Sequence, residues 1–147
     1  MKIRTDENVA PLLTEILKKT ATGRGVELTS IYDAGQRGYG DESWVRAFAD
    51  LGGEAVVSGD KDFIKRSSLI VCVHDLGLRV AVLPPSWQQL KLRQQAIRLL
   101  QWWPRLEHVL ADGVPGSFYQ VKNQKGETPA IFPKPIDMGR HRRTRSR

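Results

Sequence analysis

Acidic side chains recur in the first 62 residues and are the residues of this chain best suited to chemistry. Six of them form three pairs: Asp6 with Glu7, Asp41 with Glu42, and Asp60 with Asp62. Several carboxylates in one pocket repel each other unless protons or a divalent cation neutralise them. If the fold brings the pairs together, the predicted chemistry is cleavage of phosphodiester bonds that depends on Mg²⁺ or Mn²⁺.

Two of the three pairs follow a predicted strand directly. A short strand opens at Ile3 and ends near Asp6, and a strand over 54–58 leads through a glycine to Asp60 and Asp62. In an open parallel sheet, ligands gather beyond the carboxyl ends of the strands. Acids that are far apart in the sequence are therefore expected to meet at one edge of the sheet.

Each acid also has a purely structural explanation. Asp6 could cap the following helix, and Asp60 with Asp62 could form a local turn. Asp41 opens a predicted helix after a glycine-rich stretch, where the helix dipole alone favours an acid. We take four carboxylates as predicted metal ligands and two as second-rank candidates: Asp6, Asp41, Asp60 and Asp62, then Glu7 and Glu42.

The elements that must position these acids alternate between strand and helix. Short connections between them predict a parallel sheet with helices on both faces. Residues 64–76 fit either a strand or a helix, and we favour a helix. The predicted strands cover 3–6, 26–31, 54–58 and 79–83, and the predicted helices cover 8–20, 41–51, 64–76, 87–103 and 104–111.

The C-terminal part departs from this alternation. Segments 117–121 and 128–132 read as two strands joined by a turn at 123–126, which predicts a hairpin at the sheet edge. The last nine residues contain five arginines and no acid, and are expected to be disordered. The predicted organisation is a domain over 1–111, an extension over 112–138 packed on it, and a basic tail over 139–147.

Charge is distributed unevenly along the 147 residues. The net charge is +7, with −2 in residues 1–75 and +9 in residues 76–147, so an acidic half is joined to a half that could attract a polyanion. No apolar run is long enough for a membrane span, and the start lacks a signal-peptide pattern, so we expect a cytoplasmic protein with no membrane partner. Cys72 is the only cysteine, which excludes an internal disulfide.

Three motifs together resemble the PIN-like domain. They are the opening Lys2–Asn8 with its Asp-Glu-Asn sequence, the helix start Asp41–Trp44, and the segment Val56–Phe63. Within PIN-like domains they are similar to the VapC-like toxins that begin with "DEN", over roughly residues 1–111.

The resemblance implies a three-layer α/β/α fold and an Mg²⁺- or Mn²⁺-dependent endoribonuclease, commonly the toxin of a type II toxin–antitoxin pair. Its RNA would be cut by a water molecule that the ion activates. The implied partners are RNA, an antitoxin protein and a second copy of the chain. The family's acids carry over to Asp6, Asp41, Asp60 and Asp62, and Ser58 matches a small or hydroxylated residue before the third acid pair. Many PIN domains place a glutamate in mid-helix as the second acid, and this chain departs from that pattern.

Two other classes of protein remain open. A response-regulator receiver domain also places acids after strands one and three, but needs a hydroxyl residue after strand four and a lysine after strand five. A catalytically inactive PIN-like module would bind RNA or a partner without cleavage. The basic helix bounded by Trp87 and Trp103 reads either as a core stripe or as an RNA track with stacking aromatics.

Overall fold

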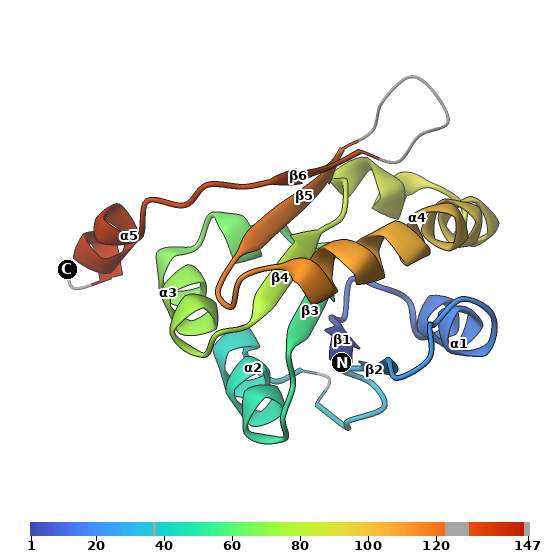
Figure 1. Cartoon of the computed structure of the whole chain (residues 1–147), viewed down its shortest axis with the longest axis horizontal. Helices are drawn as coiled ribbons and strands as arrows, with labels where there is room; N and C mark the ends of the chain where they lie inside the picture. The colour runs from blue at the N-terminus through green and yellow to red at the C-terminus, as the bar shows by residue number, and fades with distance from the viewer. Residues whose placement is uncertain (37, 123–129, 146–147) are drawn as a thin grey trace.

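A six-stranded sheet forms the centre of the computed structural model, which describes residues 1–36, 38–122 and 130–145 (Figure 1). The strand order is β2-β1-β3-β4-β5-β6. The first five strands pair in parallel, and β6 runs antiparallel to β5. The predicted mixed α/β class with a parallel central sheet is confirmed. The strands are β1 (Lys2–Thr5), β2 (Glu27–Ser30), β3 (Ala55–Ser58), β4 (Arg79–Val82), β5 (Phe118–Lys122) and β6 (Ala130–Pro133).

Helices cover both faces of this sheet, which gives three layers. Helices α1 and α4 lie on one face and α2 and α3 on the other (Figure 1). Two short 3₁₀ turns, η1 (Lys61–Ile64) and η2 (Pro85–Gln89), follow β3 and β4. The helices are α1 (Pro11–Thr20), α2 (Asp41–Asp50), α3 (Ser67–Asp75), α4 (Leu92–Asp112) and α5 (Met138–Arg145).

The strand residues divide between two hydrophobic cores. Ala55 and Val57 of β3 face α1 and α4, whereas Val56 between them faces α2 and α3. Successive side chains of a strand point to opposite faces, so a strand buried on both sides reads as a continuous apolar run. This explains why β3 is apolar at three consecutive positions and why its end is fixed firmly in the middle of the molecule.

Helix α1 begins later than the sequence predicts. Asn8, where the predicted helix starts, lies in a turn instead, and its backbone N–H donates to Asp6 Oδ1 at 3.1 Å. The backbone N–H of Val9 donates to the carbonyl of Asp6 at 3.1 Å. The helix then starts at Pro11, a residue whose fixed φ and missing N–H suit the first helical position. The residues after β1 therefore serve the loop rather than the helix.

Helix α4 is continuous where two helices are predicted. Pro104 lies inside it, although a proline removes one backbone hydrogen bond from a helix. A single apolar stripe on either side of Pro104, including Leu99, Trp103, Leu106 and Leu110, is buried against the sheet. Burial of side chains of this size contributes about 1.5–3 kcal/mol each, which offsets the lost hydrogen bond.

The tryptophans belong to the core. Trp87, Trp102 and Trp103 are all buried, and the rings of Trp87 and Trp102 meet edge to face at 5.4 Å between centroids. Helix α4 starts at Leu92, and Trp87 lies in η2 before it, not in the predicted long helix. The core interpretation of these aromatics holds, and they offer no exposed ring on which an RNA base could stack.

The structure also differs from the sequence prediction at the C-terminal end. Strands β5 and β6 pair at the sheet edge, and the predicted turn at 123–126 lies outside the described residues. The basic segment expected to be disordered is a helix, α5, as far as Arg145. Helix α5 packs on α3. So short a charged helix is not stable alone in water, and this packing explains why it forms.

The structure also bears on the expectations for membrane spans and for Cys72. Among the described residues, no helix is long and apolar enough to cross a membrane. Cys72 is buried in α3, in the core between the sheet and the helices α2 and α3.

Candidate active site

The carboxyl ends of β1 and β3 bring two of the predicted acids to one edge of the sheet. Thr5 pairs in register with Val57, so the next residues along both strands leave the sheet side by side. The backbone N–H of Asp6 donates to the carbonyl of Val57 at 3.3 Å, which extends the pairing by one residue. Asp6 and the segment Ser58–Asp60 therefore adjoin each other.

Asp6 is the buried acid of this edge, with 1% of its surface exposed. Its carboxylate accepts hydrogen bonds from the hydroxyl of Ser58, from the backbone N–H of Gly59 at 3.3 Å and from the backbone N–H of Asn8 at 3.1 Å. Burial raises the pKa of Asp6 to about 6, although the bonds from Ser58, Gly59 and Asn8 act in the opposite direction. Asp6 therefore organises the loops after β1 and β3.

Asp60 and Asp62 form the local turn that the sequence left open. The Asp60 carboxylate accepts from the backbone N–H of Asp62 at 2.9 Å and caps η1. The backbone N–H of Asp60 donates to the Ser58 hydroxyl at 2.8 Å. Ser58 thus connects Asp6 with Asp60 through one hydroxyl group. Both Asp60 and Asp62 are partly exposed, and each retains a carboxylate oxygen outside this turn.

Gly59 leaves room for the close approach of two neighbouring connections at this turn. A Cβ atom at Gly59 would lie 2.6 Å from Nε2 of Gln88 and 3.1 Å from Cβ of Asn8. The Gln88 side chain donates to the carbonyl of Gly59 at 2.6 Å, which ties η2 to the same edge. The turn that contains Gly59 is therefore fixed by contacts with Asn8 after β1 and with Gln88 of η2.

Arg66 joins the two remaining acids across the site. Its guanidinium lies 3.2 Å from Oδ2 of Asp41 and 3.8 Å from Oδ2 of Asp62. Trp44 also donates from its ring N–H to the other Asp41 oxygen at 3.2 Å. The Arg66 side chain is 42% exposed, so it lies at the surface of the site.

Sequence reasoning did not identify Arg66. It follows Asp62 by four residues, a spacing that favours an ion pair in a helix, but these residues belong to a 3₁₀ turn and the stretch before α3. Its contact with Asp41 depends on the packing of α2 beside α3, which local spacing does not reveal.

The second-rank acids lie at the margin. Glu7 is exposed, and its backbone carbonyl accepts from the Tyr32 hydroxyl at 3.1 Å. Glu42 borders an open hollow of about 430 Å³ at the start of α2, together with Asp41 and Arg66. Position alone therefore makes Glu42 better placed than Glu7 to approach a ligand at Arg66.

The acids lie in two linked groups rather than in one cluster. Asp6 and Asp60 share Ser58, Asp41 and Asp62 share Arg66, and the turn from Asp60 to Asp62 connects the two groups. Within the described residues, no three acidic, histidine or cysteine side chains are grouped so that they could hold a metal ion. The positive charge between Asp41 and Asp62 is supplied by the chain itself.

Lys122 bears on the receiver-domain alternative, which needs a lysine after strand five, and it was not identified from the sequence. It is the last residue of β5, the fifth parallel strand, because β5 pairs with β4 as well as with β6. Its ammonium lies 5.2 Å from the centre of the Phe132 ring. Strand β4 is followed by Leu83 and two prolines, with no hydroxyl side chain at its end.

The fold and this edge define a three-layer α/β/α protein with carboxylates beyond the ends of its central strands. Comparison with known families matches residues 1–84 to the family described as "PIN like domain", and the chain belongs to this family. A search of curated proteins and a search of solved structures find no match. PIN-like domains are generally nucleases, which are hydrolases. The matched region includes all six acids and Arg66, whereas α4, β5, β6 and α5 lie beyond it.

Proposed function

We propose that this chain is an endoribonuclease that depends on Mg²⁺ or Mn²⁺. The observation that carries the proposal is the connection of Asp6 with Asp60 through Ser58 at the carboxyl edge of β1 and β3, with Asp62 in the turn that follows, within the matched PIN-like region. This is the part of an open α/β sheet where ligands and chemistry gather.

The candidate ligands are of the chemical type that a hard divalent cation prefers. Asp41, Asp60 and Asp62 offer carboxylate oxygens, which Mg²⁺ and Mn²⁺ prefer, and two of the three already share the charge of Arg66. Because no three of these carboxylates among the described residues are grouped to hold an ion, Asp41 and Asp62 would have to leave Arg66 and turn toward Asp60 to hold it. Asp6 remains the fourth proposed ligand. When bound, such an ion supplies an activated water and stabilises negative charge on the reacting phosphate.

Arg66 has a role both before and after a divalent cation binds. In the structure it neutralises Asp41 and Asp62, two acids that would otherwise repel each other. An arginine at the surface of the site can turn away from the carboxylates and pair with a phosphate, since its planar fork fits two phosphate oxygens. We therefore expect Arg66 to leave Asp41 and Asp62 when a divalent cation and RNA are present.

Asp6 and Ser58 prepare the position of Asp60. The Ser58 hydroxyl donates to Asp6 and accepts from the backbone of Asp60. Asp6 also holds the backbone N–H of Gly59. This network fixes the loop before any ligand binds, which lowers the entropic cost of arranging the site.

A cleavage assay with matched variants tests the proposal. Purified wild type, Asp60→Asn and the control Asp50→Asn, whose acid is exposed at the end of α2, are incubated with structured RNA and Mg²⁺ or Mn²⁺. We expect Asp60→Asn to reduce the cleavage rate about 100-fold and the control to leave it unchanged. Equal cleavage by all three proteins would indicate a contaminating nuclease and remove the proposal.

A second candidate function is an inactive PIN-like module that binds RNA or a protein partner. It is favoured by the absence of a three-acid group among the described residues and by the Arg66 bridge between Asp41 and Asp62. The same assay separates the two functions. RNA binding without cleavage in every metal tested would favour the inactive module.

The receiver-domain alternative has less support. Its parallel strand order, β2-β1-β3-β4-β5, occurs here as well, so strand order does not distinguish the two classes. The family match favours the nuclease class, as does the sequence after β4, where Leu83 and two prolines separate the strand end from Ser86. Stable phosphorylation of an aspartate by acetyl phosphate would support a receiver domain instead.

The biological setting belongs to the same proposal. We propose a cytoplasmic toxin of a type II toxin–antitoxin pair, of the VapC-like kind, acting as a homodimer. Its support is the Asp-Glu-Asn motif at residues 6–8 together with the PIN-like family. Growth arrest on expression, relieved by a protein encoded beside it, is the expected result. Light scattering of the purified chain measures whether it forms a dimer.

A further inference from the structure

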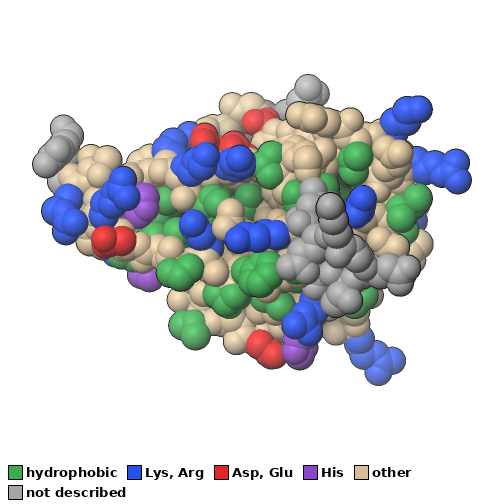
Figure 2. All heavy atoms as spheres, turned by 90° about the horizontal axis from the view of Figure 1, so that it is seen from above, with side chains coloured by type: hydrophobic (Ala, Val, Ile, Leu, Met, Phe, Trp, Pro, Cys, Tyr) green, Lys and Arg blue, Asp and Glu red, His purple; other side chains and the backbone are tan. Residues whose placement is uncertain are grey.

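Helix α5 is a strongly cationic element at the end of the described chain. Arg140, His141, Arg142 and Arg143 follow one another within it, and the helix contains no acidic residue. It lies beyond the region that matches the PIN-like family, so the family assigns it no role. Lys and Arg side chains gather around α5 at the left end of the face in Figure 2.

The helix is anchored by polar contacts to both ends of α3. The Arg142 guanidinium makes two hydrogen bonds to the Asp75 carboxylate, at 2.5 and 3.2 Å. Nδ1 of His141 lies 2.8 Å from the hydroxyl oxygen of Ser67. Since Ser67 begins α3 and Asp75 ends it, these contacts fix α5 across the whole of α3.

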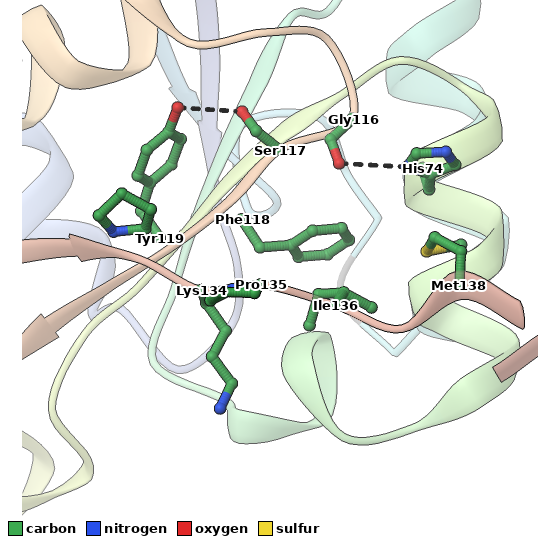
Figure 3. Close-up of a pocket in the computed structure, with 10 residues that line it drawn as sticks. His74, Gly116, Ser117, Phe118, Tyr119, Lys134, Pro135, Ile136 and Met138 are labelled. Atoms are coloured by element: carbon green, nitrogen blue, oxygen red, sulfur yellow. Dashed lines mark hydrogen bonds between the residues drawn. The ribbon is translucent and has the colours of Figure 1, made fainter. Parts of the chain in front are cut away.

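Apolar contacts anchor the segment that leads into α5. Ile136 and Met138 are partly buried against the core cluster that contains Phe118. Figure 3 shows Ile136 and Met138 beside Phe118 and His74, around a pocket of about 220 Å³. These side chains fill part of the space between β5 and α3, so packing holds the N-terminal end of α5, in addition to the ion pair of Arg142 and the hydrogen bond of His141.

The anchored helix adjoins the candidate active site. Ser67, which contacts His141, directly follows Arg66 in the chain. Arg66 is the cation that lies between Asp41 and Asp62. A polyanion that passes over α5 would therefore reach the acids after crossing Arg66.

Two arginines of α5 point away from these anchoring contacts. Arg140 and Arg143 are exposed and three residues apart, which places them on the same face of a helix. In the part of the chain that the structure describes, neither forms an ion pair with a carboxylate. Their charges are available to a ligand.

Helix α4 also presents arginines on its outer face, which has a different character. Arg93 and Arg98 are exposed there among three exposed apolar side chains, Leu92, Ile97 and Leu100. Exposed apolar side chains between charges suit a protein surface better than a phosphate backbone. The face of α5 carries no exposed large hydrophobic residue, which suits a polyanion.

We propose that α5 binds the phosphate backbone of the RNA through Arg140 and Arg143 and guides the strand toward the acids at Arg66. The choice of RNA rests on the function proposed above. Contacts of this kind are made to phosphates and not to bases, so the binding is independent of sequence. Because α5 is docked before RNA arrives, binding costs less ordering entropy than it would for a free tail.

RNA affinity without catalysis tests this proposal. Binding of a labelled single-stranded RNA of mixed sequence is measured by fluorescence anisotropy in EDTA, over a range of salt concentrations. The test variant is Arg140→Gln with Arg143→Gln. The control, Lys19→Gln with Arg24→Gln, removes the same charge from exposed residues near Gly25, which contacts the amino end of β1.

We expect the test variant to lose about tenfold in affinity and the control to lose little. The slope of log K against log salt should become shallower by about 1.4, since each phosphate contact on a single strand contributes about 0.7. Equal affinities and slopes for the two variants would overturn the proposal. That result would also leave an acidic protein partner as the ligand of α5.

The outcome is separate from that of the proposed nuclease activity. If wild type cleaves RNA in Mn²⁺ but the two variants bind RNA equally, only the role of α5 fails. If affinity falls selectively in the α5 variant but no metal supports cleavage, the role of α5 stands and the nuclease proposal fails.

Discussion

Asp6 and Asp62 are the same type of residue at the same edge of the sheet, yet their surroundings differ almost completely. Asp6 is 1% exposed and accepts hydrogen bonds from three neighbouring residues, whereas the Asp62 side chain is 49% exposed and faces Arg66. Burial penalises the charge of Asp6, and water screens the charge of Asp62. The inner acid therefore organises the backbone, and the outer acid is available to exchange cations.

The different surroundings of Asp6 and Asp62 assign stability to one acid and ligand binding to the other, although the sequence shows only two aspartates. Asp6 contributes to the arrangement of the site, so changes to it should alter stability and its pH dependence. Asp41 and Asp62 meet at a surface ion pair with Arg66, which contributes little to stability but occupies the place of a ligand. Measurements of stability and of metal binding should therefore respond to different residues.

The largest expected effect is a pH-dependent stability that comes from Asp6. Its pKa is about 6 in the folded chain, against an ordinary value of 3.8 for an aspartate in water, so the folded state holds the proton more tightly than the unfolded state. The stabilisation is fully present below pH 3.8 and is lost as the pH rises through about 6. At about 1.4 kcal/mol per pKa unit, the loss is about 3 kcal/mol.

Asp6→Asn isolates this effect from the other carboxylates. Urea unfolding of wild type and variant is measured at several pH values. The unfolding free energy of wild type minus that of the variant should fall by about 2 kcal/mol between pH 4 and pH 6.5, which is most of the total. A difference that does not change with pH would show that Asp6 is not the buried acid described here.

The second effect concerns Ser58, which connects Asp6 with the backbone of Asp60. Ser58→Ala removes a donor to Asp6 and an acceptor for the Asp60 backbone, so unfolding free energy should fall by about 2 kcal/mol. Ser43→Ala, at an exposed position of α2, is the matched control and should change it by less than about 0.5 kcal/mol. If both variants lose the same unfolding free energy, Ser58 does not connect Asp6 with Asp60 as described.

The third effect is on Mn²⁺ affinity at the outer acids. Arg66→Gln removes the charge that Asp41 and Asp62 share, and a unit charge at about 4 Å in water is worth about 1 kcal/mol. Electron paramagnetic resonance should therefore show about fivefold tighter Mn²⁺ binding. Lys65→Gln removes a neighbouring exposed charge as the control. Tighter binding in the control alone would contradict the role given to Arg66.

The smallest effect should be the stability change of Asp62→Asn. The side chains of Asp62 and Arg66 are 49% and 42% exposed, and exposed ion pairs contribute at most about 1 kcal/mol. Thermal unfolding at pH 7 should place the variant within about 0.5 kcal/mol of wild type. A loss as large as that of Ser58→Ala would make Asp62 a structural residue like Asp6.

The sequence predicted the positions of the inner acids because local patterns determine them. An apolar run identifies β3, and β1 is predicted as a short strand that opens at Ile3. The residues that follow both strands must leave the sheet at its carboxyl edge. The pairing of Thr5 with Val57 then brings Asp6 to Ser58. Parallel strand geometry is general, so no knowledge of the side-chain packing was needed.

Other features depend on contacts that no local pattern contains. Pro104 predicts a helix break, but a stripe of buried side chains on both sides of it maintains α4. Arg66 contacts Asp41 only because α2 packs beside α3. The composition of α5 predicts disorder, and its anchors Asp75 and Ser67 lie more than sixty residues earlier in the chain.

The most direct test of the central claim is a crystal structure of the protein soaked with Mn²⁺, with anomalous diffraction used to locate the ion. We expect an anomalous peak at the carboxylates of Asp60 and Asp62, with Arg66 moved away from Asp62. If the protein cleaves RNA in Mn²⁺ but shows no such peak at this edge, or shows it elsewhere, then these carboxylates are not the metal site.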